Sequence, residues 1–131
     1  MVHKTALTTA AIFGAIAVIL GAFGAHALKA KLTPELLSTF ETGVKYQFYH
    51  AFALIAVAIL YAYFPNAWMS RAASFFIAGI ICFSGSIYAL VALKAGGSVG
   101  LKGIGIITPI GGLFFIIGWI SMIISVYTQK Q

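Results

Sequence analysis

Acidic side chains are almost absent from this chain, whose 131 residues include two Asp or Glu against eight Lys or Arg. Only 8% of the residues are charged and 62% are hydrophobic, so there is too little polar surface to cover a water-soluble globule of this size. With so few carboxyl groups, general acid and base chemistry would have to rest on histidine. The length allows a single domain, residues 1–131.

Cysteine is represented by Cys82 alone, so no disulfide can form within the chain and the redox compartment cannot be inferred. The usual catalytic motifs are missing as well. The glycines around Lys102 lack the spacing of a phosphate-binding loop, and no nucleophile elbow or zinc-protease helix occurs. The sequence therefore predicts that the protein is not an enzyme and that it has no cofactor and no metal site.

Long stretches without any charged side chain are abundant. No Lys, Arg, Asp or Glu occurs in the four windows 5–28, 46–70, 72–93 and 103–129. A helix rises about 1.5 Å per residue and a hydrocarbon core is about 30 Å thick, so roughly 20 apolar residues cross it. The sequence thus predicts an all-α integral membrane protein, a bundle of four transmembrane helices. The predicted spans are residues 5–28, 46–64, 70–93 and 104–127.

The link between the first two spans carries the signals of a helix start. Thr33 is a suitable N-cap residue and Pro34 suits the first helical position. Apolar side chains then recur every fourth residue at Leu36, Phe40 and Val44, with polar residues on the other faces. This pattern predicts an amphipathic interfacial helix between spans one and two.

A second Thr-Pro pair, Thr108-Pro109, leaves two alternatives for the fourth span. In one, the helix begins at this pair after a non-helical approach that is buried in protein or faces water. In the other, a flexible loop runs into a helix with an early proline. Both alternatives leave enough apolar residues to cross the membrane.

Positive charge is divided unevenly between the two sides of the predicted membrane domain. An even number of spans puts both termini on one side, together with Lys4, Arg71 and Lys130. The other five basic residues fall on the opposite side, and they are Lys29, Lys31, Lys45, Lys94 and Lys102. The positive-inside bias therefore predicts that both termini lie outside.

Small residues at regular spacing let helices approach closely in lipid, where the hydrophobic effect does not drive helices together. We expect such residues to pack the bundle, or to meet another copy of the chain or a partner membrane protein. The candidates are Gly14 and Gly21 in the first span, Ser74, Ala78, Cys82 and Ser86 in the third, and Gly111 and Gly118 in the fourth.

Polar residues at the predicted span ends are the candidate ligand site. His26 closes the first span and His50 lies one turn into the second, so antiparallel helices place both on one side of the membrane. Gln47 lies three residues before His50, and Lys102 belongs to the same side. One interpretation is a pair of interfacial histidines without a ligand. Another is a site for an anionic headgroup or small anion.

Four segments in order resemble the signature segments of a known family, and the resemblance extends over nearly the whole chain. They are GAFGAHALK at 21–29, YQ at 46–47 followed by HAFAL at 50–54, FSGSIY at 83–88, and TPIGG at 108–112 followed by GW at 118–119. The family is that of the YgdD/YwdK-like small bacterial membrane proteins, a domain of unknown function similar to transmembrane protein 256 of eukaryotes. The resemblance implies a multi-pass inner-membrane protein with four helices and no known catalytic residues.

The sequence predicts that the protein is a structural or accessory module that binds membrane lipid or a partner membrane protein. It predicts no binding of nucleic acid. One alternative is a small carrier or channel with a polar site around His26 and His50, and a further alternative is a haem- or metal-binding bundle. A continuous polar path from His50 toward Trp119 would favour the carrier. A dry, closed core would favour the module.

Overall fold

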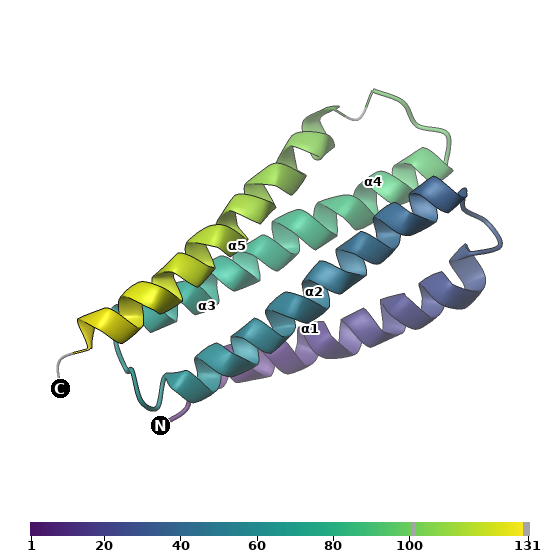
Figure 1. Ribbon diagram of the computed structural model, residues 1–131. Helices are drawn as coiled ribbons and strands as arrows, with labels where there is room; N and C mark the ends of the chain where they lie inside the picture. The colour runs from purple at the N-terminus through teal and green to yellow at the C-terminus, as the bar shows by residue number, and fades with distance from the viewer. Residues whose placement is uncertain (101, 130–131) are drawn as a thin grey trace.

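The structure is a computed structural model that describes residues 1–100 and 102–129, and Figure 1 shows long helices running along one axis. The elements are α1 (Lys4–Phe23), the π-helix η1 (Gly24–Leu28), α2 (Pro34–Leu60), α3 (Ala67–Gly79), the π-helix η2 (Ile80–Ser84), α4 (Gly85–Ala95) and α5 (Lys102–Thr128). They form four rods long and apolar enough to cross a membrane, and the described residues contain no strand. The prediction of an all-α membrane bundle is confirmed.

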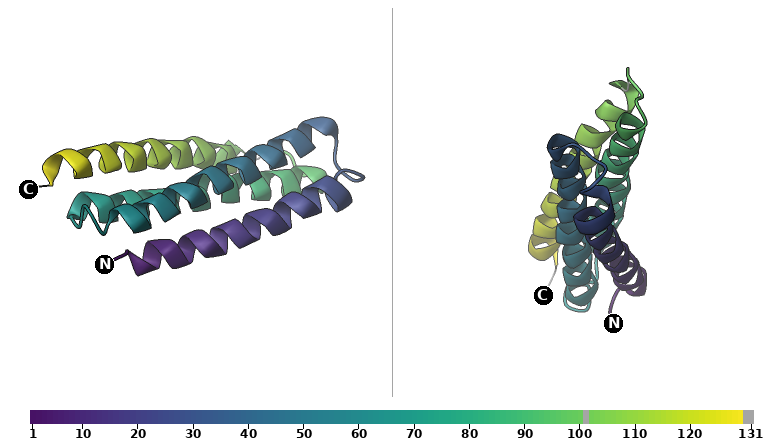
Figure 2. Two further views of the ribbon diagram at one scale, coloured as in Figure 1. Left: turned by 60° about the horizontal axis from the view of Figure 1, so that its bottom comes forward. Right: turned by 90° about the vertical axis from the view of Figure 1, so that its right-hand side faces the viewer.

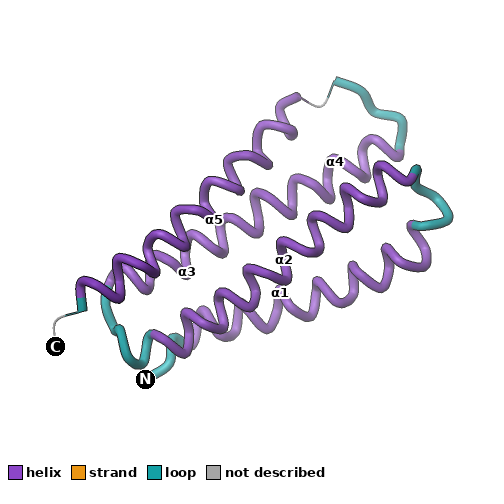
Figure 3. The backbone as a smooth tube through the Cα atoms, in the orientation of Figure 1, coloured by secondary structure: helices purple, strands orange, loops and turns teal. Residues whose placement is uncertain are grey.

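The start of α1 and the end of α5 lie at one end of the bundle, beside the turn between α2 and α3 (Figures 1 and 3). The connections from η1 to α2 and from α4 to α5 lie at the opposite end. Successive rods therefore run antiparallel, as an even number of crossings requires.

Helix α2 begins at the predicted signal. The Thr33 side chain accepts a hydrogen bond from the Leu36 amide at 3.3 Å, and Pro34 takes the first helical position. The helix then continues to Leu60 without a break, so the amphipathic segment is the first part of the second span rather than a separate interfacial helix. Gly43 does not interrupt it, because this glycine is buried where Ile87 and Tyr88 pack against the helix.

Helix α5 begins at Lys102 and contains Pro109, so the alternative in which it starts at the Thr108-Pro109 pair is wrong. A proline ring is placed against the carbonyl four residues earlier, here that of Gly105, and removes one backbone donor. Membrane helices tolerate this where neighbouring groups compensate. The Thr108 hydroxyl lies 2.6 Å from the Ser86 hydroxyl of α4, which ties this first part of α5 to the third span.

The third rod is central to the packing. Helix α5 lies along α3 and η2, and α2 packs against α3, η2 and α4, while α1 packs along α2. Within the described residues the outer helices α1 and α5 share no extensive contact. The bundle is therefore not closed on itself, and Figure 2 shows it from two further sides.

The predicted small-residue stripe of the third span is not its packing face. Ser74 is exposed, Ala78 and Cys82 are half-buried, and only Ser86 is buried. The residues that are buried at four-residue spacing are Ala72, Phe76, Ile80 and Ser84. That series is offset by two residues, which is about 200° around a helix of 3.6 residues per turn. The buried face of this rod therefore combines large side chains, Phe76 and Ile80, with small ones, Ala72 and Ser84.

The predicted glycines divide into two groups. A Cβ at Gly111 would meet the Phe83 backbone, and one at Gly118 would meet the Phe76 ring at 2.6 Å, so both lie at close helix contacts. A Cβ at Gly21 would lie 3.6 Å from Val44, an ordinary contact. Gly14 has open space around its Cβ position and takes no part in close packing.

Candidate functional site

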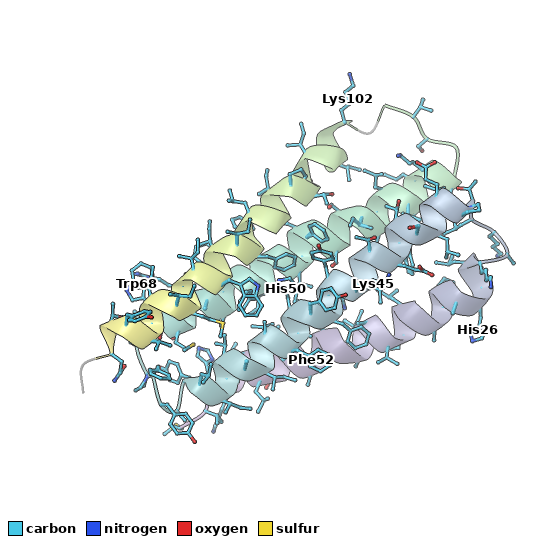
Figure 4. The ribbon with its side chains drawn as sticks, viewed as in Figure 1. His26, Lys45, His50, Phe52, Trp68 and Lys102 are labelled. Atoms are coloured by element: carbon cyan, nitrogen blue, oxygen red, sulfur yellow. The ribbon has the colours of Figure 1, made fainter. Side chains whose placement is uncertain are left out.

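His50 lies deep in the bundle, about 24 Å along α2 from Pro34 at 1.5 Å per residue. Its imidazole is 5% exposed and stacks on the ring of Phe115 from α5, with centroids 3.4 Å apart and planes 7° apart. Phe76 of α3 lies beside it, at a centroid distance of 5.6 Å. Figure 4 shows His50 in the middle of the bundle, well away from either end.

Both ring nitrogens of His50 have partners. Nδ1 lies 2.8 Å from the Tyr46 carbonyl oxygen, which can only accept, so Nδ1 carries the hydrogen. Trp119 donates its indole N–H to Nε2 at 3.3 Å, so Nε2 is unprotonated. The ring is thus held as one neutral tautomer. It can offer a lone pair to a metal, or take a proton, only by giving up the contact with Trp119.

A cleft of about 670 Å³ lies beside His50, between α2 and α5, and Phe83 of η2 contributes to its lining. Its lining is mostly apolar, and it consists of Tyr46, His50, Phe83, Pro109, Gly112, Leu113, Phe115, Ile116 and Trp119. A volume of this size falls within the range of small-molecule sites, about 300–1,000 Å³. Because α2 and α5 both have the length and composition of membrane spans, and the lining residues lie well inside the two helices, a bilayer around the bundle would face the cleft from the side.

The structure does not bring the predicted ligand residues together. His26 lies in η1 at the loop end of the first span, and Lys102 lies at the start of α5, as Figure 4 shows. Only His50 lies in the cleft. The prediction assumed that the second span begins at residue 46, but α2 begins at Pro34, which moves His50 from the end of a span to its middle.

Gln47 faces away from the cleft and joins three helices. Its side-chain amide donates to the Phe13 carbonyl of α1 at 2.8 Å, and its oxygen accepts from the Tyr88 hydroxyl of α4 at 2.7 Å. The residue is 2% exposed, and both ends of its side chain are occupied by protein groups. It therefore cross-links α1, α2 and α4 and does not line the cleft beside His50.

The aromatic residues of the cleft were missed by sequence reasoning. Tyr46 and His50 lie four residues apart on α2, and Phe115 and Trp119 lie four apart on α5, so each pair shares a helical face. That spacing was the available signal, but it does not show that the two faces meet. In the part of the chain that the structure describes, no group of three or more His, Cys, Asp or Glu could hold a metal ion.

Comparison with known proteins places the chain in a family. Residues 20–112 match a family described as Protein of unknown function (DUF423). A UPF0382 membrane protein of Staphylococcus aureus is 40% identical, over 95% of this chain and 96% of its own length. YwdK of Bacillus subtilis is 38% identical over 93% of this chain and 95% of its own length.

The UPF0382 inner membrane protein YgdD of Escherichia coli K12 is 32% identical over 100% of this chain and 95% of its own length. No solved structure matches the chain. The names of the relatives state a membrane location and no activity, which agrees with the four apolar helices. This chain is therefore a multi-pass membrane protein and belongs to the UPF0382 family of uncharacterised membrane proteins.

Proposed function

We propose that the protein is a non-enzymatic accessory module of the cell membrane, and that it binds a membrane lipid in the cleft between α2 and α5. The observation that carries this proposal is the cleft itself, which is large and mostly apolar and is lined by residues of two helices long and apolar enough to span a membrane, so that a surrounding bilayer would face it from the side. A molecule that enters from this side has to be dissolved in the bilayer. Apolar lining stabilises such a molecule by packing and excludes ions.

The polar groups argue against the carrier alternative. Every buried side-chain nitrogen or oxygen among the described residues has a hydrogen-bond partner within the protein. The pairs His50 with Trp119 and Gln47 with Tyr88 belong to separate clusters on different faces of α2. A transported polar solute would need groups along its path that are free to bind it, and this arrangement favours a static module instead.

The state of His50 argues against enzymatic chemistry at the cleft. A general base or acid must reach a substrate proton with a free nitrogen or N–H. Both nitrogens of His50 are engaged, one with a backbone carbonyl and one with an indole N–H. The same geometry disfavours the haem or metal alternative, because His3 and His26 lie at opposite ends of the first rod whereas His50 lies midway along α2.

Quenching of tryptophan fluorescence by brominated lipid tests the proposal. The chain has two tryptophans, and Trp119 lines the cleft whereas Trp68 does not, so Trp68→Phe leaves a single reporter at the site. In nanodiscs with a low fraction of brominated acyl chains, we expect Trp119 to be quenched more strongly than random contact with surrounding lipid would allow.

A filled cleft provides the control. Gly112 lines the cleft and has ordinary space around its Cβ position, so Gly112→Leu is expected to block the site without displacing backbone. The matched variant Gly105→Leu adds the same side chain on the same helix, in open space outside the cleft. Excess quenching should disappear in Gly112→Leu and persist in Gly105→Leu. Equal quenching in both variants and the parent would overturn the proposal.

A further inference from the structure

A lysine lies inside the second span rather than at its edge. The sequence predicts a span that begins just after Lys45, but α2 runs without a break from Pro34 to Leu60. This helix is the least hydrophobic of the four spans. Lys45 and Glu41, which lies one turn earlier, are both exposed on its surface. The second span therefore carries two opposite charges on its outside.

Contacts with the third rod show how deep Lys45 lies. The Ser84 hydroxyl donates to the Gly43 carbonyl at 2.7 Å, so this part of α2 is level with Ser84. Along its own rod, Ser84 lies about 20 Å from Arg71 and about 15 Å from Lys94. Lys45 is therefore close to the centre of a hydrocarbon core about 30 Å thick.

The first rod gives the same depth. The Gln47 amide donates to the Phe13 carbonyl at 2.8 Å, and Phe13 lies about 12 Å into the charge-free window 5–28, which is about 36 Å long. Lys45 lies about 3 Å nearer the loop end than Gln47, which moves it still closer to the middle of that window. Figure 4 shows Lys45 between the two ends of the bundle.

A charged side chain at this depth is costly in lipid, so Lys45 needs a partner. Extension of the side chain along the helix moves the ammonium about one turn, ~5 Å, and leaves it ~10 Å short of the level of Lys94. Lipid phosphates lie beyond the hydrocarbon core, so they do not reach Lys45 in an undeformed bilayer. A protein carboxylate is the partner that this depth favours.

Glu41 provides a carboxylate of this kind on the same exposed face, four residues before Lys45. If the two paired within one helix, both charges would still face acyl chains, because this side of α2 is uncovered. A hollow of about 120 Å³ lies beside them, and its lining includes Gly21 and Gly24. Small residues of this kind let another helix approach closely.

We propose that a second copy of the chain docks on this face, and that Lys45 of each copy pairs with Glu41 of the other. A two-fold interface is self-complementary, and one base and one acid on the same face meet that requirement. A two-fold axis along the membrane normal keeps equal residues at equal depth, and the lysine side chain spans the difference of one turn. The two reciprocal pairs remove all four charges from lipid.

This interface is separate from the lipid cleft. The hollow beside Glu41 and Lys45 lies between η1 and α2, whereas the cleft lies between α2 and α5. A dimer formed through the first face leaves the cleft of each copy open to lipid. The dimer and the lipid site can therefore be tested independently.

Energy transfer between labelled copies measures the association. On a Cys82→Ala background, Val2→Cys carries a donor or an acceptor dye, and vesicles are prepared at decreasing ratios of protein to lipid. We expect the parent to show transfer above the level of random proximity. Lys45→Gln should weaken association about tenfold, because both pairs are lost and two carboxylates remain in lipid. Lys94→Gln removes an exposed lysine near the end of its rod and should associate as the parent does.

A charge-exchanged variant separates pairing between copies from pairing within one helix. Glu41→Lys combined with Lys45→Glu keeps both charges, so this double variant should associate with itself about as well as the parent does. In a mixture with the parent, lysine would face lysine and glutamate would face glutamate, so the two should not associate. Pairing within one helix predicts no such discrimination.

Random-level transfer in the parent would overturn the inference, and so would unchanged association of Lys45→Gln or free mixing of the double variant with the parent. A monomer that retains anionic lipid through Lys45 would assign this lysine to a headgroup instead. Association that is lost in Lys45→Gln, together with rejection of the parent by the double variant, supports the dimer. The lipid cleft is tested separately by Gly112→Leu.

Discussion

Among residues 1–100 and 102–129, each buried polar side chain has a hydrogen-bond partner within the protein, which matters because hydrocarbon offers none. An unsatisfied polar group at membrane depth is costly, so the pairs that form also determine which helices lie together. Gln47 connects α2 to both α1 and α4, and Ser84 donates to the Gly43 carbonyl at 2.7 Å, which connects η2 to α2. These bonds hold the first three spans in one arrangement beside the cleft.

The bond between Gln47 and Tyr88 can be measured with a double-mutant cycle. Tyr88→Phe leaves the Gln47 oxygen unpaired and should destabilise the protein, but in a Gln47→Leu background the same change should cost less. The expected coupling is about 0.6 kcal/mol, the average found between polar pairs in membrane helices. Unfolding in mixed micelles provides the free energies, with Tyr49→Phe as the exposed control. Fully additive losses would show that the two side chains do not interact.

For single residues, the sequence predicts which side chains are neighbours on one helix, but not how deep they lie or which helix they face. The spacing of Tyr46, Gln47 and His50 correctly indicates neighbouring positions around one helix, but it contains no information on depth or on the facing element. Gln47 and His50 lie about 60° apart at 100° per residue, which is enough to direct one toward α1 and the other toward α5. The grouping of His26, His50 and Lys102 failed because it placed the start of the second span at residue 46, whereas α2 runs without a break from Pro34.

Local sequence signals predict some helix boundaries of the bundle better than others. The start of α2 at Pro34 was predictable, because an N-cap side chain and a proline act together there. The start of α5 was left open between two alternatives, and the structure agrees with the helix that contains an early proline, since α5 begins at Lys102 and includes Pro109. In a membrane, helical hydrogen bonding outweighs weak propensity, since exposed backbone groups have no water to bond.

Helix α5 depends on two glycines for its close contacts, which leads to a prediction about substitutions. Gly111→Ala puts a methyl group against the Phe83 backbone, so it should destabilise the protein by about 1 to 3 kcal/mol. Gly105→Ala adds the same methyl group in open space and should be neutral or stabilising by up to about 1 kcal/mol. Thermal unfolding in detergent compares them. A Gly111 variant as stable as the Gly105 variant would refute the close approach.

At the scale of the whole molecule, the four spans were predictable from the sequence because a helix surrounded by lipid must be long and apolar. Charge-free windows of sufficient length identify membrane helices without knowledge of their packing. The cleft could not be read in this way. It arises because α2 and α5 both pack on the third rod and meet each other mainly through side chains such as His50 and Phe115.

The number of crossings can be tested by cysteine labelling. On a Cys82→Ala background, a cysteine at Val2 and one at Lys31 lie at opposite ends of the first rod. A membrane-impermeant maleimide applied to intact spheroplasts should label only one of the two, and disruption of the membrane should expose the other. Labelling of both from the same side would contradict the transmembrane arrangement of the first rod.

The most direct test of the account is to identify what occupies the cleft in the membrane. The protein and its Gly112→Leu and Gly105→Leu variants would be extracted in polymer nanodiscs, stripped of loosely held lipid by detergent exchange, and analysed for bound lipids by mass spectrometry. We predict that the parent and Gly105→Leu retain the same apolar lipid and that Gly112→Leu loses it. Retention of an identical lipid set by all three proteins would contradict a ligand site between α2 and α5.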